Sequence, residues 1–107
     1  MYAQIARDDR IYLRENTLDV SEEFYDFGRL IVELVDDVLY SRRTHQEVHE
    51  ILLQLRLDGP RHSTYHEARI SEFRSNISWA FQQDEHEEII ELRDSLEAFL
   101  DRPRLSE

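Results

Sequence analysis

The chain has 107 residues, enough for one small domain with a single core, and its 24 acidic against 13 basic residues give a formal net charge of −11. It contains no cysteine, which excludes disulfides, thiolate metal sites and cysteine nucleophiles. No run of about 18 apolar residues predicts a membrane span, and the charged residues Arg7 to Arg10 argue against a secretory signal, so we expect a cytoplasmic protein without a membrane partner.

The first 40 residues predict an N-terminal segment followed by a long helix. Residues 1–20 have apolar positions without a clean period, and we interpret them as an ordered arm or a short helix. Ser21 is a suitable N-cap for a helix over residues 22–41, with Glu22 and Glu23 at its positive end. The apolar stripe of this helix has spacings of three and four residues and consists of Phe24, Phe27, Ile31, Leu34 and Val38.

A second helix is predicted over residues 45–57. Thr44 and Glu47 form a capping-box pattern at its start, in which each side chain satisfies a backbone donor of the other residue. The sequence Asp58-Gly59-Pro60 ends the helix, and we expect Gly59 to adopt the left-handed conformation of a C-terminal cap.

The remaining sequence contains two apolar stripes that are out of phase. Thr64 and Glu67 repeat the capping box, and the third helix that follows has Ile70, Phe73 and Ile77 on its apolar side. Ile89, Leu92, Leu96 and Phe99 form the next stripe, so we predict a break near residue 83, with one continuous helix as the alternative. Residues 102–107 are expected to be a flexible tail.

These elements predict an all-α fold: a small antiparallel bundle of three to four helices in a single domain over residues 1–107. Short connections between helices favour antiparallel neighbours, and each helix has one apolar stripe and one charged face. The expected core consists of Phe27, Ile31, Leu34, Leu52, Leu55, Phe73, Ile77, Leu92 and Leu96.

Charge is distributed unevenly along the chain, and the chain contains no lysine. Residues 19–37 hold seven acids and one arginine, residues 84–101 hold eight acids and one arginine, and residues 41–75 are close to neutral. All 13 basic residues are arginine. A GC-rich genome and a halophilic source both explain the absence of lysine, and neither bears on activity.

Two sets of side chains are candidates for metal binding. His45 and His49 are four residues apart on one predicted helix, and His62 and His66 repeat the spacing. Glu33 and Asp36 match Glu-x-x-Asp, and residues 87–91, which include Glu88 and Glu91, match Glu-Glu-x-x-Glu. All-α nucleotide pyrophosphohydrolases use both of these motifs to bind magnesium. In those enzymes Glu-Glu-x-x-Glu comes before Glu-x-x-Asp along the chain, whereas here it comes after. Solvated helix surfaces explain both sets more simply, so we expect no metal or cofactor and keep a metal-dependent nucleotide hydrolase as an alternative.

Residues 44–75 also suggest a helix-turn-helix. In that interpretation the second helix begins beside Arg61, Ser63, Thr64 and Arg69, which suit contacts to phosphates and bases. The net charge of −11 opposes binding to nucleic acid. A DNA-binding transcriptional regulator is therefore an alternative, not the leading hypothesis.

The leading hypothesis is a small acidic protein-interaction or regulatory protein without enzymatic activity, forming a homodimer or binding another protein. A chain of this size with four amphipathic stripes has little area to close a core alone. Trp79 lies beside its apolar stripe, and we expect an exposed aromatic patch of Phe73, Trp79 and Phe81 at the interface.

Overall fold

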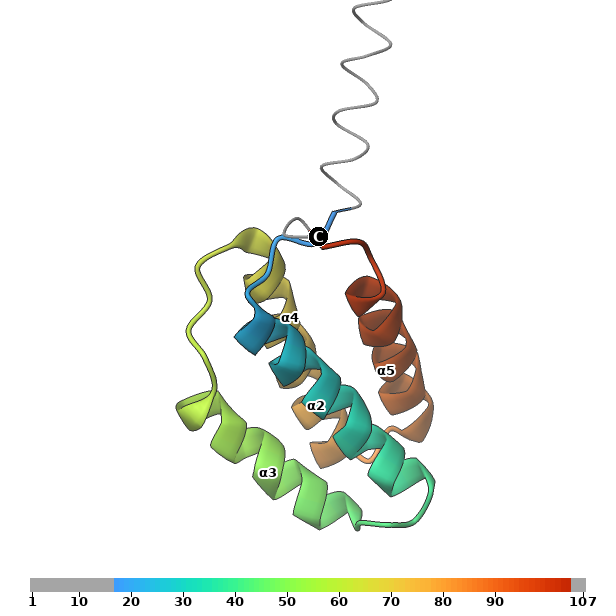
Figure 1. Cartoon of the computed structure of the whole chain (residues 1–107). Coiled ribbons are helices and arrows are strands. Elements are labelled where there is room, and N and C mark those ends of the chain that lie inside the picture. Colours follow the sequence, from blue (N-terminus) through green and yellow to red (C-terminus); the bar gives the residue numbers. More distant parts are fainter. Residues whose placement is uncertain (1–16, 105–107) are drawn as a thin grey trace, which may run out of the picture.

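The computed structural model describes residues 17–104, which form four α-helices and no strand, so the all-α prediction is confirmed for this part of the chain. Figure 1 shows the helices in chain order: α2 (Glu22–Leu39), α3 (His45–Asp58), α4 (Tyr65–Gln82) and α5 (His86–Leu100). Most of the predicted N-terminal arm and the last three residues lie outside the described residues. None of the described helices is long and apolar enough to cross a bilayer.

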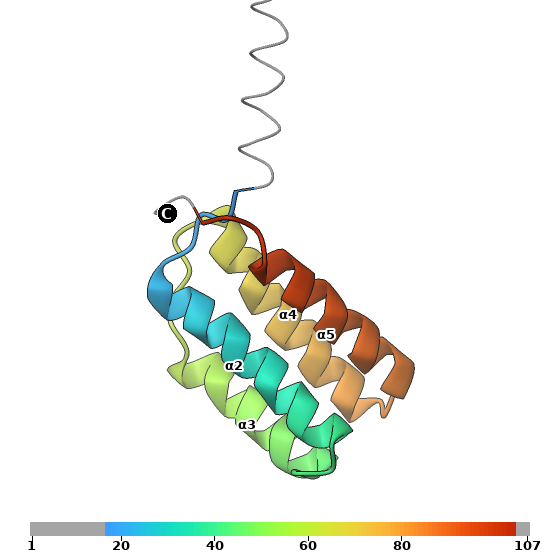
Figure 2. The same ribbon diagram turned by 45° about the vertical axis from the view of Figure 1, so that its right-hand side comes forward.

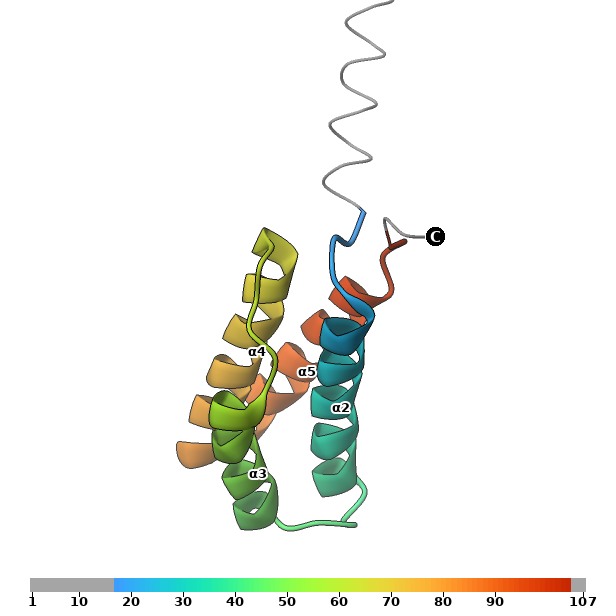
Figure 3. The same ribbon diagram turned by 60° about the vertical axis from the view of Figure 1, so that its left-hand side comes forward.

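The four helices form one antiparallel bundle in which α2 and α4 occupy the central positions. Each of these two helices lies next to the other three, whereas the backbones of α3 and α5 lie on opposite sides of the bundle and are not adjacent. Figure 2 shows α3 beside α2 and α5 beside α4, and Figure 3 shows the same bundle from a view that separates α2 from α4. The peripheral position of α3 leaves much of its surface uncovered.

The helix boundaries follow the local signals of the sequence. The side chains of Ser21, Thr44 and Thr64 each accept a hydrogen bond from the backbone amide three residues later, at 3.1 Å in all three caps. The predicted break near residue 83 is confirmed, because α4 ends at Gln82 and α5 begins at His86. Asp84 in this turn has a positive φ of 55°, so a left-handed residue follows the C-cap residue Gln83.

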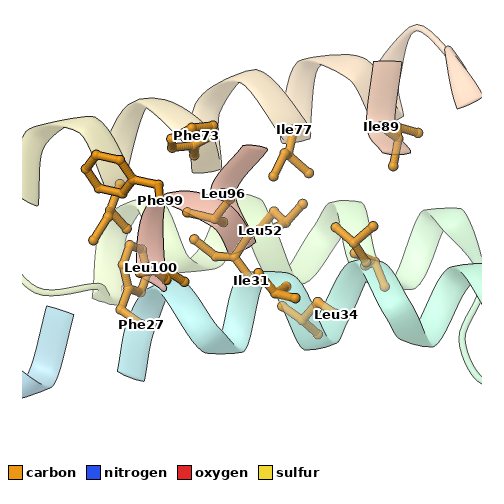
Figure 4. Packing of buried hydrophobic residues seen from close by; sticks show 14 of the residues in the cluster. Phe27, Ile31, Leu34, Leu52, Phe73, Ile77, Ile89, Leu96, Phe99 and Leu100 are labelled. Carbon is orange, nitrogen blue, oxygen red and sulfur yellow. The ribbon is translucent and has the colours of Figure 1, made fainter. Parts of the chain in front are cut away.

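The core contains most of the predicted residues (Figure 4). Seven are buried as expected, namely Phe27, Ile31, Leu34, Leu52, Phe73, Ile77 and Leu96. Leu55 and Leu92 are only partly buried and pack against the edge of the cluster. Figure 4 shows Leu52 of α3 among the labelled residues of this cluster, together with Ile31 of α2 and Leu96 of α5.

The predicted left-handed conformation of Gly59 is wrong. Gly59 has φ −72° and ψ 166°, which is extended backbone. The reason is Pro60, because the proline ring disfavours helical backbone at the residue before it. Glycine is needed here for space: a Cβ on Gly59 would lie 2.5 Å from the carbonyl oxygen of Leu55 and 3.1 Å from the ring of Phe27.

We expect Gly59→Ala to lower the free energy of unfolding by about 1–3 kcal/mol, the usual range for overpacking. The clash involves a backbone oxygen, which cannot move without distorting the last turn of α3. Urea denaturation of the two proteins measures the difference. A variant as stable as the wild type would mean that the end of α3 is free to shift.

The two ends of the described chain meet at one end of the bundle. Leu18 is fully buried, and its amide donates to the carbonyl oxygen of Pro103 at 2.7 Å. Arg104 lies over the ring of Tyr25, with its guanidinium carbon 4.4 Å from the ring centroid. Of the tail predicted over residues 102–107, residues 102–104 lie against the bundle through these contacts, and residues 105–107 are outside the described part.

Candidate functional site

The two histidine pairs lie at opposite ends of α4. His45 packs edge-on against Phe81, and its Nδ1 lies 3.4 Å from Asp84 Oδ1 at the α4–α5 turn. His66 is near the start of α4, which places it about 22 Å from Phe81 at a rise of 1.5 Å per residue. His49 Nδ1 is buried and has no hydrogen-bond partner among the described residues. The structure therefore does not bring the histidine pairs together.

The candidate carboxylates are also separated by their contacts. Asp36 on α2 binds Arg93 on α5 through both oxygens, at 2.8 and 3.1 Å, whereas Glu33 is exposed. Arg93 contacts Asp94 and Glu97 as well, and the hydrogen bonds with Asp36 are the main cause that raises its pKa above the ordinary arginine value. Asp36 thus joins two helices and is already neutralised by a cation.

Glu88 and Glu91 line an open acidic hollow at the start of α5, together with Glu85 and Glu87. A hydrogen bond shared with the Glu85 carboxylate, partial burial and the charges of Glu85 and Glu91 raise the pKa of Glu88. Within residues 17–104, no three histidine, aspartate or glutamate side chains are close enough together to hold a metal ion.

Most of the residues proposed for DNA contacts in the helix-turn-helix interpretation form contacts within the protein instead. Six residues, 59–64, connect α3 to α4, whereas a helix-turn-helix has a turn of three or four. The amide and hydroxyl of Ser63 both donate to Glu67, and the hydroxyl of Thr64 donates to the carbonyl oxygen of Asp19 at 2.6 Å. Arg69 lies over the rings of Phe73 and Phe99. These contacts favour structural roles for Ser63, Thr64 and Arg69.

Glu67 is the centre of this network. Its Oε2 accepts the amide of Ser21 at 2.8 Å, and its Oε1 accepts the amide of Ser63 at 2.9 Å. Burial acts to raise the pKa of Glu67, but the hydrogen bonds from Ser21 and Ser63 outweigh it and hold the pKa below the ordinary value. The carboxylate of this predicted capping box therefore does not bind Thr64 and instead ties the start of α4 to the start of α2.

The expected aromatic patch is not present as predicted. Phe73 and Phe81 are buried in the core, whereas Trp79 is 53% exposed. The physical reason is that α4 has neighbours on three sides, so its buried face is wider than one stripe and includes both phenylalanines. Of the three residues named for the interface, only Trp79 is available on the surface.

The most exposed leucines of the described chain lie on α3. Leu53 is 45% exposed and Leu57 is 72% exposed, and a spacing of four residues places both on one side of the helix. We call this side, defined by Leu53 and Leu57, the α3 outer face. α3 buries only Val48 and Leu52 against the bundle, so it is the helix with the smallest covered surface.

A second feature that the sequence analysis missed is a hollow of about 520 Å³ between the end of α3, the connection to α4 and α4 itself. The connection is the yellow-green segment at the left edge of Figure 1. We call this hollow the arginine pocket, because Arg56, Arg61 and Arg74 line it. Its apolar lining includes Phe27, Leu55, Pro60 and Leu57 of the α3 outer face, and its other polar residues are His62 and Ser71. No acidic residue lines it, although 24 of the 107 residues are acidic.

No protein-family model, curated protein or solved structure matches this chain.

Proposed function

We propose that this protein is a non-enzymatic regulatory protein of the cytoplasm that acts through protein–protein contact, as a homodimer joined at the α3 outer face. The observation that supports this proposal most strongly is the exposure of Leu53 and Leu57 on the helix that is least covered by its own chain. Two copies of α3 packed against each other would bury these leucines symmetrically, as an isologous interface requires.

Charge supports the choice of this face. Two copies with a net charge of −11 repel each other, and the acids are concentrated in residues 19–37 and 84–101, which include most of α2 and α5. Residues 41–75 contain six arginines and five acids and include all of α3. α3 itself has three acids and one arginine, a smaller excess of acids than in α2 or α5, so a second copy approaches this side at a lower electrostatic cost than it would approach either of those helices. Trp79 on the adjacent helix α4 is exposed as well and is a second candidate for the contact.

The test is the oligomeric state of the double variant Leu53→Gln/Leu57→Gln by light scattering at matched concentration. Glutamine is a good helix former, so the variant is expected to keep its helix content and lose the apolar contact. Wild type should have twice the mass of one chain at high micromolar concentration, and the double variant should be a monomer. Tyr40→Gln is the control, because Tyr40 is 70% exposed and lies at the end of α2.

A monomeric wild type at high concentration would contradict the homodimer. A dimer that the double variant leaves intact would place the interface elsewhere. In that case Trp79→Ala distinguishes a contact centred on α4 from one centred on α3.

A further inference from the structure

The arginine pocket has a positive charge that the protein does not neutralise. Arg74 is only 7% exposed. Its guanidinium group donates to two neutral acceptors, the carbonyl oxygen of Leu52 at 3.3 Å and the hydroxyl of Ser75 at 2.6 Å. No carboxylate within residues 17–104 forms an ion pair with it. A buried charge is costly unless a counter-charge accompanies it, so this arrangement is unusual in a chain with an excess of acids.

The groups next to Arg74 add positive charge to the pocket instead of neutralising it. Burial is the main cause that lowers the pKa of Arg74 below the ordinary arginine value, and the nearby positive charge of Arg56 lowers it further. Arg61 lines the same hollow from the connection before α4. Arg93 shows the contrast, because that guanidinium is contacted by three carboxylates. Three arginines of one chain thus line the same hollow, and none of them forms an ion pair within residues 17–104.

We propose that the arginine pocket binds a small phosphate monoester. The phosphate would be held by Arg56, Arg61 and Arg74, because the planar guanidinium group donates paired hydrogen bonds to phosphate oxygens. The organic group would rest on the apolar lining of Phe27, Leu55 and Pro60. A dianion fits three cations better than a single carboxylate does, and a volume of about 520 Å³ lies within the range of small-molecule sites.

The size and charge of the protein favour a small ligand over a macromolecule. A net charge of −11 repels a polyanion along its whole length, whereas a compact dianion feels mainly the local charge of the pocket. All residues of the pocket belong to one chain, and one of them, Leu57, is also part of the α3 outer face.

The test is isothermal titration of the full chain with phenyl phosphate, inorganic phosphate and phenol. Phenyl phosphate is expected to bind with one site per chain, inorganic phosphate more weakly, and phenol not at all. Arg56→Gln and Arg61→Gln each remove one charged donor and should weaken phenyl phosphate binding about tenfold. Both residues are exposed, so these two variants are expected to fold. Arg74 is buried, and a substitution there could unfold the protein, so it is not used in this test. Arg42→Gln is the control, since it makes the same charge change on an exposed residue outside the pocket.

Three results would overturn the proposal. The first is the absence of phenyl phosphate binding to the wild type at millimolar concentration. The second is an equal loss of affinity in Arg42→Gln and in the two pocket variants, which would indicate a general charge effect. The third is tighter binding of a phosphoserine peptide than of phenyl phosphate, which would assign the pocket to a protein partner and not to a small molecule.

Discussion

Leu34→Ala should lower the free energy of unfolding by about 2–5 kcal/mol, the range for removing a buried leucine side chain. Leu34 is 4% exposed on α2, one of the two helices that contact all three others, and it belongs to the buried cluster (Figure 4), so the cavity would open inside the bundle. Chemical denaturation monitored by circular dichroism measures the loss.

Leu30→Ala is the matched control for this experiment. Leu30 lies one helical turn earlier on α2 and is 38% exposed, so the same substitution should cost less than about 1 kcal/mol. Equal costs for the two variants would mean that the phase of α2 differs from the structure.

Glu67→Ala is expected to have the second large effect, a loss of about 2–4 kcal/mol. The substitution removes a charged acceptor from the amides of Ser21 and Ser63, and hydrogen bonds to charged groups contribute about 1.5–3 kcal/mol each. Because Glu67 is 3% exposed, water replaces these bonds poorly. The measurement is again the free energy of unfolding in denaturant.

Glu47→Ala is a close control, because Glu47 occupies the same position after Thr44 as Glu67 does after Thr64. The Glu47 side chain is exposed and contacts only the Thr44 hydroxyl, at 3.2 Å, so its removal should cost less than about 1 kcal/mol. Similar losses in both variants would show that the link from α4 to α2 contributes little.

The stabilisation by Glu67 should also depend on pH. Its pKa is lower in the folded protein than in the unfolded chain, so its contribution is complete above the unfolded pKa of about 4.3 and is lost as the pH falls through the folded pKa. The difference in stability between wild type and Glu67→Gln should therefore shrink on acidification below that value. A difference that stays constant would contradict the role of the ionised carboxylate.

The helices and their caps could be predicted because the signals are local. Ser21, Thr44 and Thr64 cap the helices that follow them, and the change of phase between stripes located the turn at Gln83 and Asp84. What could not be predicted is which helix lies at the centre. Phe73 and Phe81 are buried because α4 has three neighbours, and the number of neighbours is a property of the assembled bundle.

One feature of the sequence does point to the arginine pocket and to the hydrogen bonds of Glu67. Glu67 and Arg74 stand at spacings of three and four from Ile70, so both fall within the apolar stripe of α4. Charged residues at core positions need partners, which marks them for structural or binding roles. Their actual surroundings depend on how α3 and α4 align, which brings the Leu52 carbonyl to Arg74, and no local pattern fixes that alignment.

The homodimer at the α3 outer face is tested most directly by NMR on a mixture of carbon-13-labelled and unlabelled chains, recording only contacts between different chains. We expect nuclear Overhauser effects from the methyl groups of Leu53 and Leu57 in one copy to α3 of the other. A sample at high concentration that gives no contacts between chains, or gives them only at α2 and α5, would contradict the proposed interface.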